Sequence, residues 1–161
     1  NSNATVIILD NRATAMTGGQ EHPGTGRTLM GEISQTTDIE TLVRALGVKN
    51  FRKPDAYDYD AMLTTISEEM AKPGPSVILT TRPCVLMPER IMDEPYVVDL
   101  ELCNGCSACF RISCPAIAAA TETNEHGHPK AIIDETVCTG CTLCAQICKP
   151  EAIILRSQYV A

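Results

Sequence analysis

The sequence predicts two small units in series, an α/β unit with a parallel sheet followed by an α+β unit built from a repeat. Short apolar runs alternate with helical patterns through the first half of the chain, which is typical of a parallel sheet. The second half repeats a strand, a cysteine run and a further apolar segment. Pro83, Pro88 and Pro95 lie between the two halves, so residues 83–96 are predicted to form a linker.

The first apolar run, residues 5–9 (TVIIL), predicts a buried strand that ends at Asp10. Residues 11–31 contain too many glycines and prolines for a regular element. A loop of this length within a compact unit is usually functional or disordered. Asp38 can cap a helix that continues to Gly47.

The rest of the first unit continues the alternation. A short strand is expected near residues 50–52, and a second helix opens at Asp58 or Asp60. Glu68 and Glu69 are interpreted as the solvent-facing side of that helix. The apolar residues 77–79 then predict another buried strand, so helices and strands alternate as in a parallel α/β sheet.

Composition and charge exclude several classes of function. The 161 residues include 13 Lys and Arg against 20 Asp and Glu, a net charge of -7 that disfavours nucleic acid as a partner. No apolar run approaches the roughly 18 residues of a membrane span, and the first residues do not resemble a signal peptide. We therefore expect a soluble cytoplasmic protein with no membrane partner.

Eight of the nine cysteines lie close together in two runs of equal spacing. The first run is Cys103, Cys106, Cys109 and Cys114, and the second is Cys138, Cys141, Cys144 and Cys148. Three thiolates spaced three residues apart can bind three irons of one [4Fe–4S] cluster, and the fourth iron needs a more distant thiolate. The spacing therefore predicts a ferredoxin-like module with two [4Fe–4S] clusters, whose function is to transfer electrons.

In the bacterial two-cluster pattern the distant ligand comes from the other run. Cys148 is then expected to complete the first cluster, with Cys103, Cys106 and Cys109. Cys114 is expected to complete the second cluster, with Cys138, Cys141 and Cys144. Zinc sites use separated Cys-x-x-Cys pairs, and a third cysteine at equal spacing in each run has no such rationale.

Two details depart from that pattern. Four residues separate Cys109 from Cys114 where three are usual, and Lys149 lies between Cys148 and Pro150. We expect the additional residue to distort the first helix without moving the ligands. Its effect is then on the reduction potential, through altered hydrogen bonds to sulfur.

The ninth cysteine and the histidine pair His126 and His128 are expected to have no role in the chemistry. Cys84 is expected to be a small buried residue, the alternative being a reactive thiol near an active site. His126 and His128 flank a glycine and are expected to lie in a solvated turn rather than a metal site.

The loop after Asp10 carries a family resemblance. It reads DNRATAMTGGQ over residues 10–20, and His22-Pro23-Gly24 follow. This segment resembles the diphosphate-binding loop of the thiamine-diphosphate-dependent 2-oxoacid:ferredoxin oxidoreductases. Together with the cysteine runs, it makes the chain similar to the carboxyl-terminal part of the α subunit in the indolepyruvate branch of that family. The fold is then an α/β remnant of a thiamine-diphosphate-binding domain joined to an α+β ferredoxin-like module.

The resemblance implies roles for five residues of the loop. The Asn11 side chain and the Ala13 carbonyl would bind the Mg²⁺ that bridges the cofactor's diphosphate, since Mg²⁺ prefers oxygen ligands. Thr17 and Gly18 would lie near the phosphates and the thiazolium. Pyruvate-type members have Asn where this chain has Met16, so the resemblance implies a site for a bulky aryl 2-oxoacid.

The family pattern also divides the chain. Residues 1–82 correspond to the carboxyl-terminal half of the thiamine-diphosphate domain and residues 97–161 to the two-cluster ferredoxin domain. The family's Gly-Asp-Gly segment and activating Glu are expected upstream of Asn1. No catalytic residue is therefore assigned, and this piece alone is not expected to bind the cofactor tightly or to decarboxylate a substrate.

The partners that the resemblance implies are a β subunit, an external ferredoxin, coenzyme A and the 2-oxoacid. Two alternatives stay open. The parent enzyme can act instead on pyruvate or another 2-oxoacid. The chain can also be a non-catalytic iron–sulfur subunit that carries electrons and has an α/β domain without a ligand.

Overall fold

The computed structural model describes residues 2–14, 18–87 and 92–159. The chain forms two compact units, Asn1–Ile91 and Met92–Ala161, each with its own β-structure and buried residues. The boundary between the units lies within the predicted linker. Among the described residues, no helix has the length and apolarity needed to cross a membrane.

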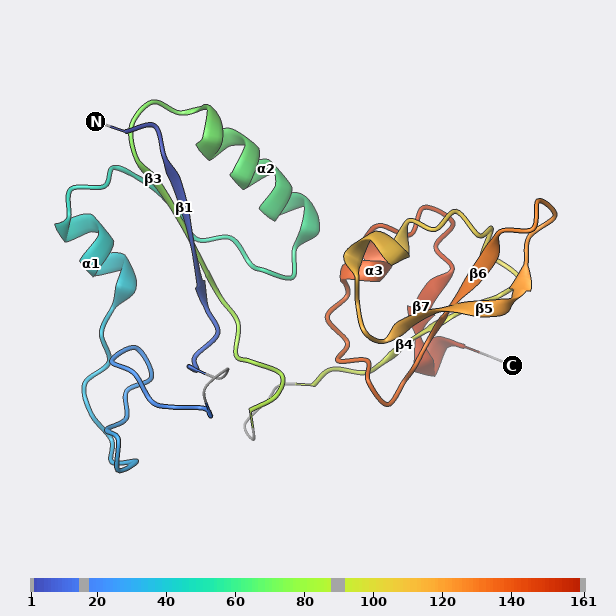
Figure 1. Ribbon diagram of the computed structural model, residues 1–161, viewed down its shortest axis with the longest axis horizontal. Coiled ribbons are helices and arrows are strands. Elements are labelled where there is room, and N and C mark those ends of the chain that lie inside the picture. Colours follow the sequence, from blue (N-terminus) through green and yellow to red (C-terminus); the bar gives the residue numbers. More distant parts are fainter. Residues whose placement is uncertain (1, 15–17, 88–91, 160–161) are drawn as a thin grey trace. The chain divides into compact units, whose positions relative to one another are not determined.

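The first unit contains a three-stranded parallel sheet. Its strands are β1 (Thr5–Asp10), β2 (Asn50–Arg52) and β3 (Ser76–Thr81), in the spatial order β1-β3-β2. Parallel strands need crossover connections, and α1 (Ile39–Ala45) and α2 (Tyr59–Ala71) supply them on opposite faces of the sheet (Figure 1). The predicted α/β alternation with a parallel sheet is confirmed.

Both helices begin where aspartate side chains cap them. Asp38 Oδ1 accepts a hydrogen bond from the Thr41 N–H at 2.9 Å, and Asp58 Oδ1 accepts one from the Ala61 N–H at 2.9 Å. Each cap satisfies a backbone donor that has no partner within the helix. Asp58, and not Asp60, is therefore the residue that opens α2.

The two apolar strands of the sheet differ in burial. β3 lies between its two neighbours, and its residues 76–80 are all buried. β1 pairs on one side, and its Val6, Ile7 and Leu9 are 51%, 42% and 74% exposed. The prediction of a buried strand over residues 5–9 is therefore correct for the strand and wrong for its burial.

Glu69 of α2 is buried, although its neighbour Glu68 is exposed as expected. The interpretation of Glu69 as solvent-facing is wrong, since it is 1% exposed. Lys72 Nζ donates to Glu69 Oε1 at 2.5 Å, and this hydrogen bond holds the pKa of Glu69 below its ordinary value. A buried carboxylate is tolerated where a cation compensates its desolvation, which helical periodicity cannot reveal.

The second unit is built from two pairs of antiparallel strands. β4 (Tyr96–Val98) pairs with β7 (Ile153–Leu155), and β5 (Ile117–Thr123) pairs with β6 (Pro129–Ile133). Three short helices complete the unit, namely η2 (Cys109–Ile112), α3 (Leu143–Gln146) and η3 (Arg156–Gln158). This arrangement confirms the predicted α+β module.

The core of the second unit contains cysteines as well as aliphatic residues. Its buried members are Val98, Cys109, Ala131, Cys144 and Ile153. Each cysteine run contributes one residue to this core, so both runs pack at the centre of the unit.

Candidate functional site

The first cysteine run begins in a tight loop between β4 and η2 that holds Cys103 and Cys106. Gly105 of this loop has a φ of +68°, and a Cβ there would meet Asn124 Nδ2 and the His128 carbonyl oxygen at 3.1 Å each. Glycine adopts this conformation without steric cost, so it lets the loop fold closely against the β5–β6 hairpin.

The second run has the same construction before α3. Gly140 lies between Cys138 and Cys141 and has a φ of +74°. A Cβ at this position would lie 2.6 Å from Asp93 Cβ and 2.8 Å from the Glu94 carbonyl oxygen. The backbone that leads into β4 therefore covers the second loop more closely than the hairpin covers the first.

An aspartate precedes each run by four residues. The Cys103 N–H donates to the Asp99 carbonyl at 2.9 Å, and the Cys138 N–H donates to the Asp134 carbonyl at 3.0 Å. The side chain of each aspartate also accepts the N–H two residues further on, at 2.8 and 2.9 Å. Sequence reasoning missed these two turns, although the equal spacing of the aspartates within the repeat is a signal that could have found them.

Backbone hydrogen bonds join the start of each run to the end of the other. The Asp99 N–H donates to the carbonyl of Ala152, which follows the second run, at 2.8 Å. The Asp134 N–H donates to the carbonyl of Ala116, which follows the first run, also at 2.8 Å. The last cysteine of each run is therefore carried toward the first three cysteines of the other.

Four cysteines from the two runs line one cavity of the second unit. They are Cys103, Cys106, Cys109 and Cys148. Apolar side chains, including Val98, Phe110 and Ile153, complete its wall. Apolar surroundings of this kind limit the access of water to a metal centre.

The other four cysteines of the runs form a second group, in which Cys114, Cys138 and Cys141 lie near Cys144. The pKa of Cys144 is raised to about 12, mostly by burial and then by the neighbouring thiols of Cys141, Cys138 and Cys114. The Tyr96 N–H also donates to Cys138 Sγ at 3.4 Å, a kind of contact that tunes cluster potentials.

The pKa of Cys109 in the first group is likewise raised. Burial raises its pKa, followed by Cys103, with smaller contributions from Cys106 and Cys148. Four neighbouring thiols cannot all ionise unless a positive charge compensates them. A bound metal supplies that charge and keeps its coordinating thiols deprotonated.

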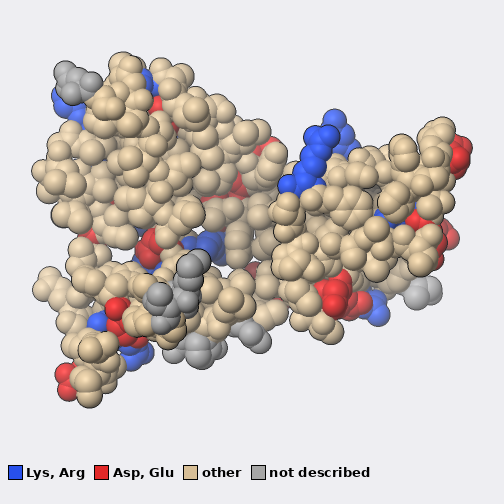
Figure 2. Space-filling view, viewed as in Figure 1, with Lys and Arg blue, Asp and Glu red and all other residues tan. Residues whose placement is uncertain are grey.

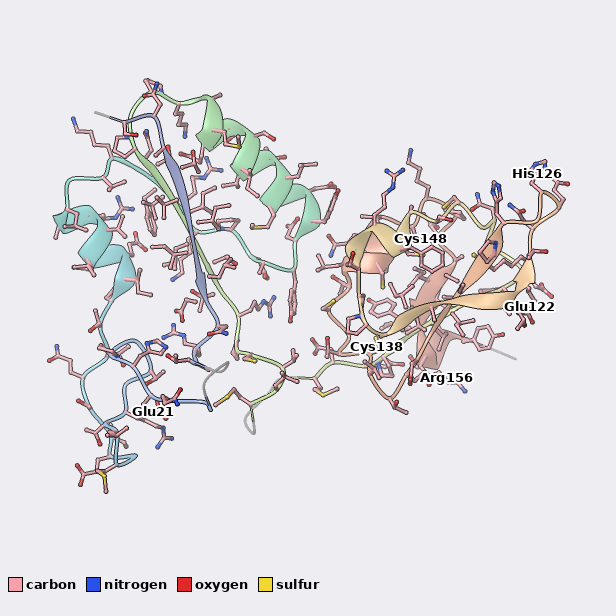
Figure 3. All side chains as sticks on the ribbon, in the orientation of Figure 1. Glu21, Glu122, His126, Cys138, Cys148 and Arg156 are labelled. Atoms are coloured by element: carbon pink, nitrogen blue, oxygen red, sulfur yellow. The ribbon has the colours of Figure 1, made fainter. Side chains whose placement is uncertain are left out.

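These two groups of four thiols fit [4Fe–4S] clusters. Within the described ranges, no three His, Cys, Asp or Glu side chains are placed to hold a single metal ion. A four-iron cluster does not need such convergence, because each thiolate binds a different iron. The structure brings together the cysteines expected for each cluster, and their assignment as ligands stays a prediction. Figure 3 shows Cys138 and Cys148 at the end of the unit away from the hairpin tip with His126.

The additional residue between Cys109 and Cys114 changes the helix within the first run. Here the chain forms the 3-10 helix η2, and Ser113 adopts a left-handed conformation with a φ of +55°. The corresponding segment of the second run is the α-helix α3. The expected distortion of the first helix takes this form.

The loop after β1 lies at the carboxyl edge of the parallel sheet, where α/β proteins bind ligands. Asp10 is buried there and its Oδ1 accepts the Arg12 N–H at 3.1 Å. Arg12 Nη1 donates to the Gly24 carbonyl at 2.9 Å, so Arg12 connects the start of the loop to its middle.

Asn11 has a side-chain oxygen that is suited to a hard metal ion. Its Oδ1 accepts the Ala13 N–H at 3.1 Å, which fixes the side chain and leaves a second lone pair free. The Asn11 carbonyl accepts the Cys84 N–H at 2.9 Å. Asn11 and Ala13 therefore fit two positions of a Mg²⁺ site, which needs about six oxygens in total.

Of the other residues expected in this loop, Gly18 has a φ of +111° and is exposed. Met16 and Thr17 lie outside the described residues. A Cβ on the following Gly19 would lie 3.9 Å from Met87, so the turn after β3 packs against the loop.

The other residues singled out in the sequence, Cys84, His126 and His128, differ in how well their expected exposure was predicted. Cys84 is half-buried, so the expectation of a buried residue is wrong. Its N–H bond to Asn11 explains this, because it holds the residue at the sheet edge. His126 and His128 are both exposed in the turn between β5 and β6, as expected.

Comparisons with known proteins match two different families to the two halves of the chain. Residues 1–79 match the thiamine pyrophosphate enzyme family, C-terminal TPP binding domain. Residues 95–149 match the 4Fe-4S dicluster domain family. The cofactor classes predicted from the sequence, thiamine diphosphate and [4Fe–4S] clusters, are confirmed at the level of these families.

Curated relatives match nearly the whole chain. The indolepyruvate oxidoreductase subunit IorA of Thermococcus kodakarensis is 38% identical over 158 residues, which cover 94% of this chain and 24% of that protein. The subunit of the same name from Methanothermobacter thermautotrophicus is 35% identical over 149 residues, covering 92% of this chain and 23% of that protein. The chain is similar to these IorA subunits over nearly its whole length.

The likeness to IorA confirms the resemblance found in the sequence. The chain spans about a quarter of the length of the IorA proteins that it matches. A third IorA subunit, from Archaeoglobus fulgidus, is 31% identical over 153 residues, or 92% of this chain and 23% of that protein. No solved structure matches the chain.

Proposed function

We propose that the chain is the electron-transfer end of a thiamine-diphosphate-dependent oxidoreductase that converts aryl 2-oxoacids, such as indolepyruvate, to acyl-CoA. Electrons leave through two [4Fe–4S] clusters to an external ferredoxin in the cytoplasm. The parent enzyme includes a β subunit and uses coenzyme A. The IorA relatives and the two domain families support this proposal.

The observation that carries the proposal is that the last cysteine of each run lies near the first three cysteines of the other run. The cavity lined by Cys103, Cys106 and Cys109 also contains Cys148, and Cys114 raises the pKa of Cys144 in the other group. We assign these two groups as the cluster ligands. Two clusters held by one repeat lie close together, which suits transfer of electrons one at a time.

The first unit's share of the reaction is to orient the cofactor. Thiamine diphosphate, when bound, supplies the carbanion chemistry that removes CO₂ from a 2-oxoacid. We assign the Asn11 side chain and the Ala13 carbonyl to Mg²⁺. The loop that holds them is fixed by Arg12 from within and by the Cys84 N–H from the turn after β3.

The assignment of substrate rests on Met16, which is apolar where pyruvate-type enzymes have Asn. The test is turnover of indolepyruvate, phenylpyruvate and pyruvate by the full-length enzyme with its β subunit. We expect the two aryl substrates to be preferred and Met16→Asn to shift the preference toward pyruvate. A strict preference of the unmodified enzyme for pyruvate would overturn this assignment.

A second measurement separates the enzyme from a simple electron carrier. Titration of the full-length enzyme with thiamine diphosphate and Mg²⁺ is expected to show binding that Asn11→Ala weakens. Absence of binding, or binding that is insensitive to Asn11, would favour the non-catalytic iron–sulfur subunit. Iron analysis and EPR of the reduced protein test the clusters independently.

A further inference from the structure

Two cations of the second unit have no acidic partner. Arg111 and Lys149 are both exposed, and within the described part of the chain neither makes an ion pair or a side-chain hydrogen bond. Between positions 92 and 161 there are nine Asp or Glu and four Lys or Arg. Unpaired cations are therefore unexpected in a unit with this excess of acid.

The other two cations of the unit are occupied. Lys130 Nζ donates to the Leu100 carbonyl at 2.6 Å. Arg156 Nε lies 3.2 Å from Glu135 Oε2, and its guanidinium stacks on the ring of Tyr159. Among the residues of this unit that the structure describes, Arg111 and Lys149 are thus the cations that are free to meet a partner.

Both free cations lie beside the first cysteine group. Arg111 follows Cys109 by two residues within η2, and Lys149 directly follows Cys148. Cys109 and Cys148 line the same cavity. Figure 2 shows Lys and Arg atoms that project from the second unit where η2 and α3 lie in Figure 1, whereas acidic atoms lie elsewhere on this face.

The first group is also the one that reaches the surface. Cys106 is exposed, whereas the other seven cysteines of the two runs are half-buried or buried. Ser107, next to Cys106, is exposed as well. Because electron tunnelling slows steeply with distance, the group that includes Cys106 is the better point of exit.

We propose that Arg111, Lys149 and the surface around Cys106 form a docking site for an acidic electron-carrier protein. This inference rests on the proposed function and names the surface through which it operates. Each transfer removes one electron from the first cluster and adds one to the carrier, and no bond is made or broken. We call Arg111, Lys149 and Cys106 the carrier surface.

The overall negative charge of the unit does not prevent such docking. Charges further away than about 8–10 Å are largely screened at physiological salt, so the local cations govern the final approach. Glu151 follows Lys149 by two residues, but within the described residues no ion pair joins them. Complementary charge of this kind sets the orientation and the rate of docking, and it makes both salt-dependent.

The test uses the full-length enzyme with its β subunit and with both clusters loaded. The probe is a small acidic two-[4Fe–4S] ferredoxin, whose Kd is measured at low and high salt. We expect Arg111→Gln and Lys149→Gln each to raise the Kd about two- to fivefold at low salt, and the double variant about tenfold. The salt dependence of the Kd should shrink in parallel.

Lys49→Gln is the matched control, because Lys49 is an exposed lysine of the first unit. It should leave the Kd unchanged. A second readout is the rate of electron transfer from dithionite-reduced enzyme to the ferredoxin. This rate should fall for the carrier-surface variants and stay constant for a small uncharged dye.

Three results would overturn the inference. The double variant could bind the ferredoxin as tightly as the unmodified enzyme. A basic cytochrome could bind more tightly than the acidic ferredoxin. The variants could lose the β subunit with no change in carrier binding, which would assign the cations to subunit assembly. None of these readouts uses a 2-oxoacid, so failure to oxidise indolepyruvate would overturn the proposed function alone.

Discussion

The two cysteine runs have the same local construction but different covers. Each has an aspartate four residues ahead and a glycine with positive φ before its second cysteine. Backbone atoms of Asp93 and Glu94 cover the second loop, whereas the Asn124 side chain and the hairpin cover the first. Cys106 is accordingly exposed where its counterpart Cys141 is half-buried.

This difference shows how a repeat can supply two unequal sites. The ligand spacing is equal in the two runs, so the runs alone would make two similar clusters. What packs over each loop sets its exposure, and exposure and hydrogen bonding to sulfur tune the reduction potential. The first group is therefore suited to exchange electrons with an external partner and the second to hold them inside the unit.

The largest expected effect comes from removal of a cysteine that acts in the other run's group. Cys148→Ala should destroy the first cluster and Cys114→Ala the second, each with a loss of about half the iron. EPR of the reduced protein identifies the cluster that is left. Cys148→Ala should leave the same signal as Cys106→Ala, and a signal equal to that of Cys141→Ala would show that the runs do not exchange ligands.

The next largest expected effect is the loss of stability when the glycine of either cysteine loop is replaced by alanine. Alanine at a left-handed position costs about 1–2 kcal/mol, and both Gly105→Ala and Gly140→Ala incur this cost. Gly140→Ala should cost more, because its Cβ would lie 2.6 Å from Asp93 Cβ and the backbone would have to move. Denaturant unfolding of the holoprotein, followed by cluster absorbance, measures the difference. Equal costs would contradict the difference in cover.

A moderate effect is expected from Asn124, which fastens the hairpin to the first loop. Its Nδ2 donates to the Asn104 carbonyl at 2.9 Å, and its Oδ1 accepts the N–H groups of His126 and His128, each at 2.9 Å. Asn124→Ala removes these hydrogen bonds, which are exposed to water, and should cost about 0.5–1.5 kcal/mol. It should alter the EPR signal of the first cluster alone.

Asn50→Ala is the matched control for this variant. Asn50 Nδ2 donates to the Pro73 carbonyl at 3.2 Å in the first unit, so the same type of bond is lost away from the clusters. Its EPR spectrum should not change. A change of both cluster signals in Asn124→Ala would mean that the hairpin supports the whole unit rather than the first loop.

The sequence predicted the order of helices and strands better than it predicted which residues are buried and what packs around the cysteine runs. Spacing is a local property, so the runs, the capping residues and the order of strands could be identified directly. The burial of Glu69 depends on Lys72, and the exposure of β1 depends on its place at the sheet edge. Asn124 is far from Cys103 in sequence, and its role requires the fold to bring the hairpin to the loop.

The smallest expected effect concerns the aspartates that precede the runs. The hydroxyl of Thr136 and then its backbone N–H lower the pKa of Asp134 below its usual value. A carboxyl with a lowered pKa adds stability above its unfolded pKa of about 3.9, and this is lost only as the pH falls through the lower folded value. The stability difference between Asp134→Ala and the unmodified protein should therefore be constant from pH 8 to pH 5.

Asp99→Ala provides the comparison for the first run. Both variants remove a turn that holds the N–H two residues further on, so both should lower the thermal midpoint by less than Asn124→Ala does. If the runs share this construction, each variant should disturb the EPR signal of its own run's cluster. An effect of Asp134→Ala on the first cluster alone would show instead that the aspartates act across the repeat, through the Ala116 and Ala152 carbonyls.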